Sequence, residues 1–383
     1  MFRSSTIKHA PSLRRSYFQW FPCLKRSYST PTSRSSNYVR LVEVGPRDGL
    51  QNEPHPIPPP IKADLVNRLG QAGIQSLEVG SFVSPRWIPQ MAGTAEVLAL
   101  IDPLPMADYA VLVPNMKGLD EVLRILAASK SPDSAAKPPP PVTEIAIFTA
   151  ATDAFAQANT NVTVSESLAR LAPVARAALD AKLKVRGYVS VIITCPYSGR
   201  VDPKRIRDVA RELFQMGCYE VSLGDTTGAG TPASIRAALE EVLKEADGHR
   251  LAGHFHDTNG TALANIFAAL ELGVRTFDTS VGGLGGCPYS PGATGNVATE
   301  DVVYALTGES LYGDSGEPYS VDSQSPDLKA KWDVGPVSLP LLAETGAWIS
   351  EILGRETTSR AGRAYLARRQ RERQLAEKAQ AKL

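Results

Sequence analysis

The chain has 383 residues, a net charge of +1 and a hydrophobic fraction of 43%. This length fits one large α/β domain or two ordinary ones, and the near-neutral charge gives no electrostatic reason to expect nucleic acid as a partner. The four cysteines contain no C-x-x-C pair, which argues against a disulfide framework and favours a reducing compartment. No apolar run reaches the length of a membrane span, so we expect no membrane partner.

The first 42 residues contain eight Lys and Arg residues, no Asp or Glu, and many serines. This composition is typical of a mitochondrial presequence, and Arg26-Ser27-Tyr28-Ser29 resembles a processing site. We therefore predict a disordered targeting leader over residues 1–37, import into the mitochondrial matrix, and a mature chain that starts near Ser29. A basic leader without an address is the alternative.

After the leader, extended and helical patterns alternate along the chain. The predicted strands cover residues 38–44, 75–79, 109–113, 144–148, 184–190, 219–223, 251–257 and 276–281. The predicted helices cover residues 61–71, 92–101, 117–128, 165–179, 203–216, 231–245, 261–272 and 300–306. Eight strands alternating with helices predict an α/β fold, a (β/α)8 TIM barrel with a closed parallel sheet. An open doubly wound sheet is the alternative, but no Gly-x-Gly-x-x-Gly follows the first strand.

The barrel is predicted to span residues 38–354, with extra helices near its C-terminal end. We expect a polar loop at Thr149–Asn161 and surface insertions at 129–141 and about 312–334. The tail, residues 355–383, reads as a basic helix, because eight basic residues and two acids follow from Arg360 onward. Its last residues, Ala381-Lys382-Leu383, are similar to the Ser-Lys-Leu peroxisomal address, so we predict peroxisomal targeting as a second address. A solvated basic helix with no address is the alternative.

Two histidines mark the candidate site. His254 and His256 lie two residues apart in a predicted strand, so their side chains share one face and can bind one metal ion. Two core histidines without a metal are the alternative. Active sites of (β/α)8 barrels lie at the carboxyl ends of the strands. Most of the side chains of this chain that could do chemistry come just after strand ends, and this clustering favours the metal site. Apart from the histidines, they are Arg47, Asp48, Glu78, Asn115, Asp225, Cys287 and Asn296.

The ligand types indicate which metal to expect. Asp48 and two histidines form a mixed nitrogen and oxygen set, and further oxygens from Asn296 and a substrate would suit Mg²⁺ or Mn²⁺. Zinc is the alternative, although it more often has three tight protein ligands and one open position. For Arg47 and Asp48, a surface turn with a local ion pair is the alternative to a role in a site.

Cys287 ends a glycine-rich segment with four glycines in the five residues after Val281. Such a loop can close over a site, and a thiol on it can act as a general acid or base. A buried loop cysteine without a chemical role is the alternative.

Several stretches resemble the 3-hydroxy-3-methylglutaryl-CoA lyase family. The stretch Val42–Glu53 closely resembles the first-strand motif of that family, with the Arg47-Asp48 pair at its centre. Four further stretches resemble family motifs: Ser81–Pro85, Val185–Ser190, Gly217–Glu220 and Gly283–Tyr289. The resemblance runs in order from about residue 38 to about residue 310. It implies cleavage of an acyl-CoA substrate, 3-hydroxy-3-methylglutaryl-CoA, into acetyl-CoA and acetoacetate, and a homodimer is common among such barrels.

The resemblance also implies roles for individual residues. It implies a divalent cation held by Asp48, His254, His256 and Asn296, with Arg47 stabilising the thioester enolate. It implies that Cys287 takes part in proton transfer and that Glu78 is a further active-site acid. Asn159, Tyr188 and Thr226 match positions that line the substrate pocket. Carbon–carbon cleavage needs a deprotonated tertiary hydroxyl and a fixed cation for the enolate, and these residue types can supply both.

The chain also departs from the family pattern. Phe255 stands between the histidines where a small residue is expected, but it should face the other side of the strand. The segment Pro54–Pro60 replaces a usually charged turn, which puts acyl-CoA contacts there in doubt. Two other functions stay open: a lyase or synthase acting on a different acyl-CoA or hydroxy acid, and an inactive barrel that serves as a binding protein. The intact residue set argues against the second.

Overall fold

We describe the fold from a computed structural model of the chain, which describes residues 37–128, 142–286, 295–307 and 332–381. Residues 1–36 of the predicted leader, the insertion at 129–141, most of the insertion at 312–334, Cys287 and the last two residues lie outside these ranges. Among the described helices, none is both long and apolar enough to cross a membrane.

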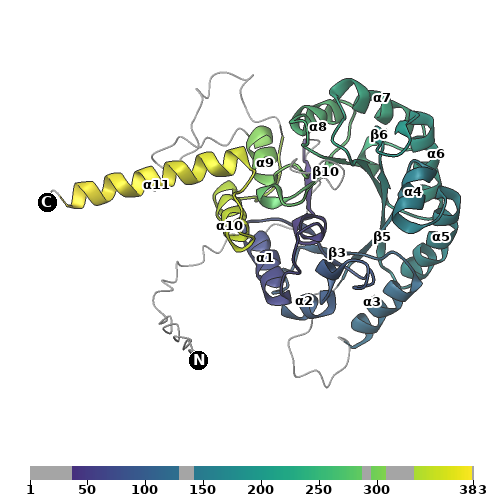
Figure 1. Ribbon diagram of the computed structural model, residues 1–383, viewed down its shortest axis with the longest axis horizontal. Coiled ribbons are helices and arrows are strands. Elements are labelled where there is room, and N and C mark those ends of the chain that lie inside the picture. The colour runs from purple at the N-terminus through teal and green to yellow at the C-terminus, as the bar shows by residue number, and fades with distance from the viewer. Residues whose placement is uncertain (1–36, 129–141, 287–294, 308–331, 382–383) are drawn as a thin grey trace, which may run out of the picture. The chain divides into compact units, whose positions relative to one another are not determined.

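Eight parallel strands close into a barrel, as the sequence predicts (Figure 1). The ring closes because the first strand pairs with the last, in register from Arg40 opposite Thr276 to Glu43 opposite Thr279. In ring order after β1, the neighbours are β10, β9, β8, β5, β4, β3 and β2. The bounds are β1 Arg40–Glu43, β2 Ser76–Ser81, β3 Asp108–Leu112, β4 Glu144–Ala150, β5 Lys184–Ser190, β8 Glu220–Asp225, β9 Leu251–Phe255 and β10 Thr276–Thr279.

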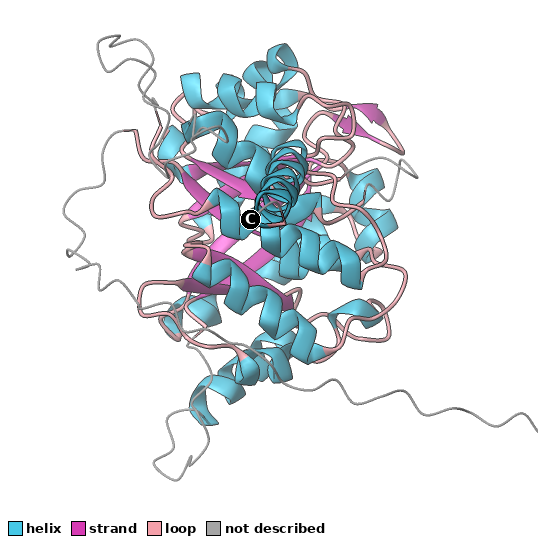
Figure 2. Cartoon of the chain, turned by 90° about the vertical axis from the view of Figure 1, so that its left-hand side faces the viewer, coloured by secondary structure: helices cyan, strands magenta, loops and turns pink. Residues whose placement is uncertain are grey.

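Helices surround the barrel, with at least one helix after each barrel strand (Figures 1 and 2). All eight predicted helices are present, with ends shifted by up to three residues. Their bounds are α1 Pro59–Gln71, α2 Thr94–Leu100, α3 Met116–Ala128, α5 Val164–Asp180, α6 Pro203–Gln215, α7 Pro232–Val242, α8 Ala262–Glu271 and α9 Thr299–Thr307.

The sequence explains why these helices form and which face they bury. In α6, the buried residues are Ile206, Val209, Ala210 and Leu213, which recur at helical spacing and form one apolar stripe. In α5, Thr163 and Glu166 form a capping box that satisfies free backbone N–H groups at the start of the helix. The apolar stripes pack on the outside of the strands and form the main hydrophobic core.

Two features differ from the sequence-based prediction. The segment Thr149–Asn161, predicted as a polar loop, contains the helix α4, Asp153–Thr160, so that prediction was wrong. Only Phe155 and Ala156 of this helix are buried, which leaves too little apolar periodicity to recognise, and Thr152 caps its start. A short hairpin, β6 Thr194–Cys195 and β7 Gly199–Arg200, follows β5 and was not predicted.

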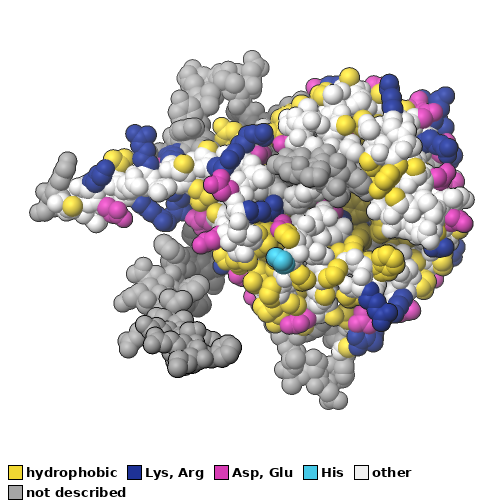
Figure 3. Space-filling view, in the orientation of Figure 1, with side chains coloured by type: hydrophobic (Ala, Val, Ile, Leu, Met, Phe, Trp, Pro, Cys, Tyr) yellow, Lys and Arg dark blue, Asp and Glu magenta, His cyan; other side chains and the backbone are white. Residues whose placement is uncertain are grey.

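Two helices extend the barrel, as predicted: α10, Leu339–Ile352, and α11, Arg360–Gln380. Asp301 holds the start of α11 by accepting hydrogen bonds from Ser359 Oγ and the backbone N–H groups of Arg360 and Ala361. Beyond Gln370 every described residue of α11 is exposed. Lys and Arg side chains are spread along this helix (Figure 3), so the described part of the tail is a solvated basic helix.

Candidate active site

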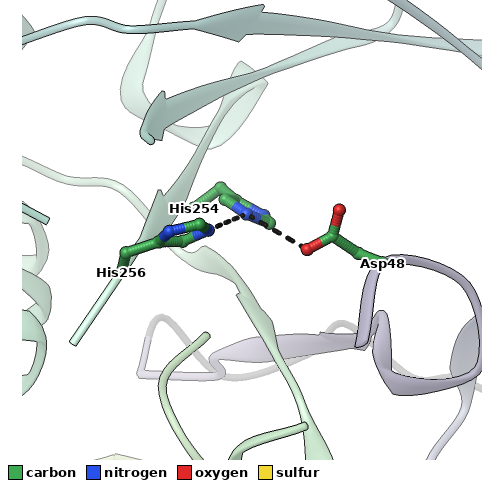
Figure 4. A group of neighbouring side chains, drawn as sticks. All are labelled: Asp48, His254 and His256. Atoms are coloured by element: carbon green, nitrogen blue, oxygen red, sulfur yellow. Dashed lines mark hydrogen bonds and ion pairs between the residues drawn. The ribbon is translucent and has the colours of Figure 1, made fainter. Parts of the chain in front are cut away.

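The carboxyl ends of β1 and β9 bring Asp48, His254 and His256 together (Figure 4). His254 is on β9 and His256 is one residue beyond it, while Asp48 lies in the helical turn η1, Gly45–Gly49, that follows β1. One ligand atom from each side chain lies within 4.8 Å of the others. The two Nε2 atoms are 3.2 Å apart, and His254 Nε2 is 3.9 Å from Asp48 Oδ2. The predicted metal set therefore converges on one point.

Asn296 joins this cluster from the chain segment beyond β10. Its Nδ2 atom donates to Asp48 Oδ2 at 2.8 Å and to the backbone oxygen of Leu284 at 3.2 Å. It also pairs with His256 in an isolated β-bridge. Phe255 is buried and packs against Phe277, which agrees with the prediction that it faces away from the histidines.

The protonation states of Asp48 and His256 suit a cation. Burial disfavours the protonated form of His254, but Asp278 and Asp48 raise its pKa above the usual value, so a cation competes with a proton at that ring. Although burial opposes ionisation of Asp48, the charges of Arg47, His254 and His256 lower its pKa to about 2. Burial, together with the neighbouring His254, lowers the pKa of His256 to about 4, so its imidazole is neutral near pH 7. An ionised carboxylate and neutral imidazole nitrogens are the forms that bind metals. Two buried ring nitrogens that face each other beside a carboxylate therefore fit a divalent cation.

Arg47 lies next to the cluster and is held from two sides. Its Nη1 donates to Asp48 Oδ1 at 2.7 Å, and its Nε donates to Glu78 on β2. The OH of Tyr188 on β5 donates to the other Glu78 oxygen at 2.5 Å. Burial alone would lower the pKa of Arg47, but Glu78 and Asp48 raise it above its usual value, so the guanidinium stays charged. The site thus contains a fixed, buried cation.

The other two predicted pocket residues, Thr226 and Asn159, differ from each other in exposure. Thr226 is partly buried, and its Oγ1 accepts a hydrogen bond from the backbone N–H of Val191 at 2.9 Å. Asn159 is exposed on α4. Asp225, noted as a strand-end residue, is buried and its Oδ2 accepts from the backbone N–H of Gly230, which holds the loop after β8. Burial raises the pKa of Asp225 to about 6.

Buried carboxylates support the start of the glycine-rich loop. Glu43 accepts from the backbone N–H groups of Gly45 and Val281, and Glu300 accepts from that of Gly282. Burial raises the pKa of Glu43 to about 7 and that of Glu300 to about 8. Gly285 has a φ of 110°, and a Cβ there would lie 2.8 Å from Asn296 Nδ2. This position therefore requires glycine to let the loop pass Asn296.

The sequence did not predict a buried polar network that contacts His254 of the site. Arg186 on β5, Ser222 on β8 and Asp278 on β10 are all fully or almost fully buried. Arg186 donates to Glu220, Tyr188 and Asp278, and Asp278 contacts His254. One signal in the sequence could have revealed this network. Arg186 stands two residues before Tyr188 in a predicted strand, and alternate residues of a strand share one face, so the charged side chain could be expected beside the tyrosine.

Comparisons with known proteins agree with this geometry. A family model described as HMGL-like matches residues 38–324. The chain is 49% identical over 330 residues to a 3-hydroxy-3-isohexenylglutaryl-CoA/hydroxy-methylglutaryl-CoA lyase of Pseudomonas aeruginosa, covering 86% of this chain and 98% of the relative. It is 44% identical to the mitochondrial hydroxymethylglutaryl-CoA lyase of Bos taurus, covering 85% and 89%.

Solved structures lead to the same family. The crystal structure of hydroxymethylglutaryl-CoA lyase from Pseudomonas aeruginosa matches with a TM-score of 0.75 and 48% identity, covering 87% of this chain and 98% of that one. The HMG-CoA lyase structure from Brucella melitensis matches with a TM-score of 0.72 and 42% identity, covering 83% and 99%. The barrel, the residue cluster and these similarities agree: the chain belongs to the hydroxymethylglutaryl-CoA lyase family and is a carbon–carbon lyase.

Proposed function

We propose that the chain cleaves 3-hydroxy-3-methylglutaryl-CoA into acetyl-CoA and acetoacetate, using a divalent cation held by Asp48, His254, His256 and Asn296. The observation that carries this proposal is the convergence of the two histidines and the aspartate at the carboxyl end of the barrel. This reaction belongs to leucine degradation and to the formation of ketone bodies.

Mg²⁺ or Mn²⁺ is the proposed ion. The donor set combines two imidazoles with oxygen donors, and the substrate's own hydroxyl and carbonyl oxygens could supply the further oxygen ligands that these ions prefer. A bound divalent cation would lower the pKa of the substrate's tertiary hydroxyl and so ease its deprotonation. Zinc stays the alternative, and metal replacement distinguishes the two.

The chain's own residues supply the rest of the chemistry. Asp48 is partly exposed and ionised, so it can take the proton of the hydroxyl group as well as bind the cation. Arg47 presents a buried positive charge to the thioester oxygen, on which negative charge develops as the carbon–carbon bond breaks. Glu78 and Tyr188 hold Arg47 in place, and Asn159, Tyr188 and Thr226 are the proposed pocket residues. Cys287, which lies outside the described residues, is proposed to deliver the proton to the enolate carbon.

The first test is acetoacetate release by the chain starting at Ser29. Activity on 3-hydroxy-3-methylglutaryl-CoA should disappear with a chelator, because the chelator removes the cation proposed to bind the substrate hydroxyl. Activity should return with added Mg²⁺ or Mn²⁺. Denatured protein with the same metal is the control. If no metal gives product, the substrate assignment fails while the family assignment stands.

A related acyl-CoA is the second candidate substrate. The relative from Pseudomonas aeruginosa carries both 3-hydroxy-3-isohexenylglutaryl-CoA and hydroxymethylglutaryl-CoA in its name. The same assay with both thioesters decides between them. A higher kcat/KM for the isohexenyl compound would identify it as the better substrate.

We further propose a mitochondrial matrix location and a homodimer. The acid-free leader and the mitochondrial relatives support the location, and the C-terminal Ala-Lys-Leu supports a peroxisomal share. A fluorescent label that leaves both ends of the chain free should mark mitochondria. The same labelled protein without its first 37 residues should move to peroxisomes. A diffuse signal after removal would reject the peroxisomal address.

Light scattering of the purified chain tests the dimer.

A further inference from the structure

Asp278 contacts the proposed metal ligand His254 from the side opposite the metal cluster. It lies on β10, and its side chain is fully buried. Its Oδ2 is 3.1 Å from His254 Nδ1 and accepts a hydrogen bond from Ser222 Oγ at 2.8 Å. Its Oδ1 accepts from Arg186 Nη2 at 2.7 Å. An ionised carboxylate can only accept hydrogen bonds, so the contact with His254 requires a proton on Nδ1.

We infer that Asp278 is a positioning residue that keeps the ring proton of His254 on Nδ1 and so leaves the Nε2 lone pair free for the cation. The inference rests on the metal site proposed above. His254 Nε2 is the atom that faces the cluster, 3.2 Å from His256 Nε2 and 3.9 Å from Asp48 Oδ2. Carboxylates that accept from the second nitrogen of a ligating histidine fix its tautomer and orientation in metal sites generally.

Arg186 determines how Asp278 itself is oriented. Its guanidinium is buried and donates to Glu220, Tyr188 and Asp278 through three different nitrogen atoms. Because Arg186 is held by three partners on three strands, the Asp278 carboxylate cannot rotate without breaking an ion pair. Tyr188 extends the same network to Glu78 and from there to Arg47. One rigid polar network therefore supports both the metal-binding histidine and the arginine of the site.

The substitution Asp278→Asn tests the inference because the amide can face only one way. Arg186 can only donate, so the amide oxygen must face it. The NH₂ group is then directed at His254 Nδ1, donates to it, and forces the ring proton onto Nε2. Replacing a carboxylate that supports a histidine by an amide is known to select the wrong tautomer in this way. The wrong proton would point into the cluster while the size of the side chain stays nearly unchanged.

Two measurements report on this change without relying on turnover. Calorimetric titration should show about 10- to 100-fold weaker Mn²⁺ binding by Asp278→Asn than by the unchanged chain. Long-range ¹H–¹⁵N spectra of ¹⁵N-histidine-labelled protein saturated with Mg²⁺ should show a protonated Nδ1 for His254 in the unchanged chain. His254→Ala identifies the signal. A protonated Nε2 in the unchanged chain overturns the inference even if the variant fails to fold.

Glu220→Gln is the matched control. It makes the same change from carboxylate to amide at another buried acceptor of Arg186, and the amide oxygen can still accept from Arg186, but Glu220 does not contact His254. Its melting temperature is expected to fall, because a buried carboxylate between Arg40 and Arg186 loses its charge. Its Mn²⁺ affinity is expected to stay close to that of the unchanged chain, because Arg186 keeps an acceptor at this position and the ion pair of Arg186 with Asp278 remains. Equal losses of affinity in both variants would show a general effect of the network and overturn the inference, as would unchanged affinity in Asp278→Asn. If His254→Ala binds Mn²⁺ normally, the proposed metal site itself fails.

Discussion

Arg47→Gln is expected to lower kcat by about 100- to 1,000-fold or more, because it removes the fixed positive charge that we propose to stabilise the developing enolate oxygen. The guanidinium is buried and held by Asp48 and Glu78, so it is oriented before the substrate arrives. A charge that needs no reorganisation stabilises the transition state more than the bound substrate. The loss should therefore appear mainly in kcat, measured by acetoacetate release under saturating substrate.

Mn²⁺ affinity separates this role from a role in the metal site. Arg47 is positively charged and neighbours Asp48, so its removal should not weaken cation binding. Arg40→Gln is the matched control, because Arg40 is a largely buried arginine that pairs with Glu220 at the amino end of β1, the opposite end from the cluster. It should lower stability and leave kcat unchanged. If Arg47→Gln keeps the kcat of the unchanged chain, Arg47 does not stabilise the enolate.

The strands could be predicted because a parallel barrel buries both faces of its sheet. Each barrel strand is a short stretch that carries buried apolar residues, such as Leu251 and Phe255 of β9, and these stretches alternate with the helices between them. The two-residue spacing of the histidines indicated one part of the site, and the fold supplied the rest. Asp48 and His254 are more than two hundred residues apart, and only the closure of β1 on β10, next to β9, brings them together.

The missed features have physical causes too. The helix α4 buries only two side chains, so it leaves almost no periodic signal in the sequence. The network around Arg186 connects residues on β5, β8 and β10, which only the closed barrel brings together; Arg186 and Asp278 are 92 positions apart, and two strands lie between theirs in the ring. A charged residue inside an apolar strand signals a buried partner, but the sequence alone does not show which one.

Asp48→Asn is expected to weaken Mn²⁺ binding and turnover together. Asp48 is the sole carboxylate in the cluster that the described residues form, and its pKa of about 2 keeps it charged at any working pH. Asparagine has almost the same size, so the variant loses the charge and one of the two hydrogen bonds that the Asp48 oxygens accept from Arg47 and Asn296. The affinity should fall by more than the roughly 10- to 100-fold typical of losing a partner that only supports a ligand. Calorimetry with Mn²⁺ measures this loss, and an unchanged affinity would reject Asp48 as a ligand.

Turnover at saturating Mn²⁺ then separates the two proposed roles of Asp48. If Asp48 only binds the cation, excess Mn²⁺ should restore kcat in the variant. If it also takes the hydroxyl proton, kcat stays low with the site filled. This is the result that we expect, because the Asp48 carboxylate is ionised and partly exposed. Cys287→Ala is the comparison variant: a residue that only delivers a proton should lose turnover and keep the full Mn²⁺ affinity. If Asp48→Asn and Cys287→Ala lose the same amount of Mn²⁺ affinity and of kcat, metal binding and proton transfer are not divided between Asp48 and Cys287.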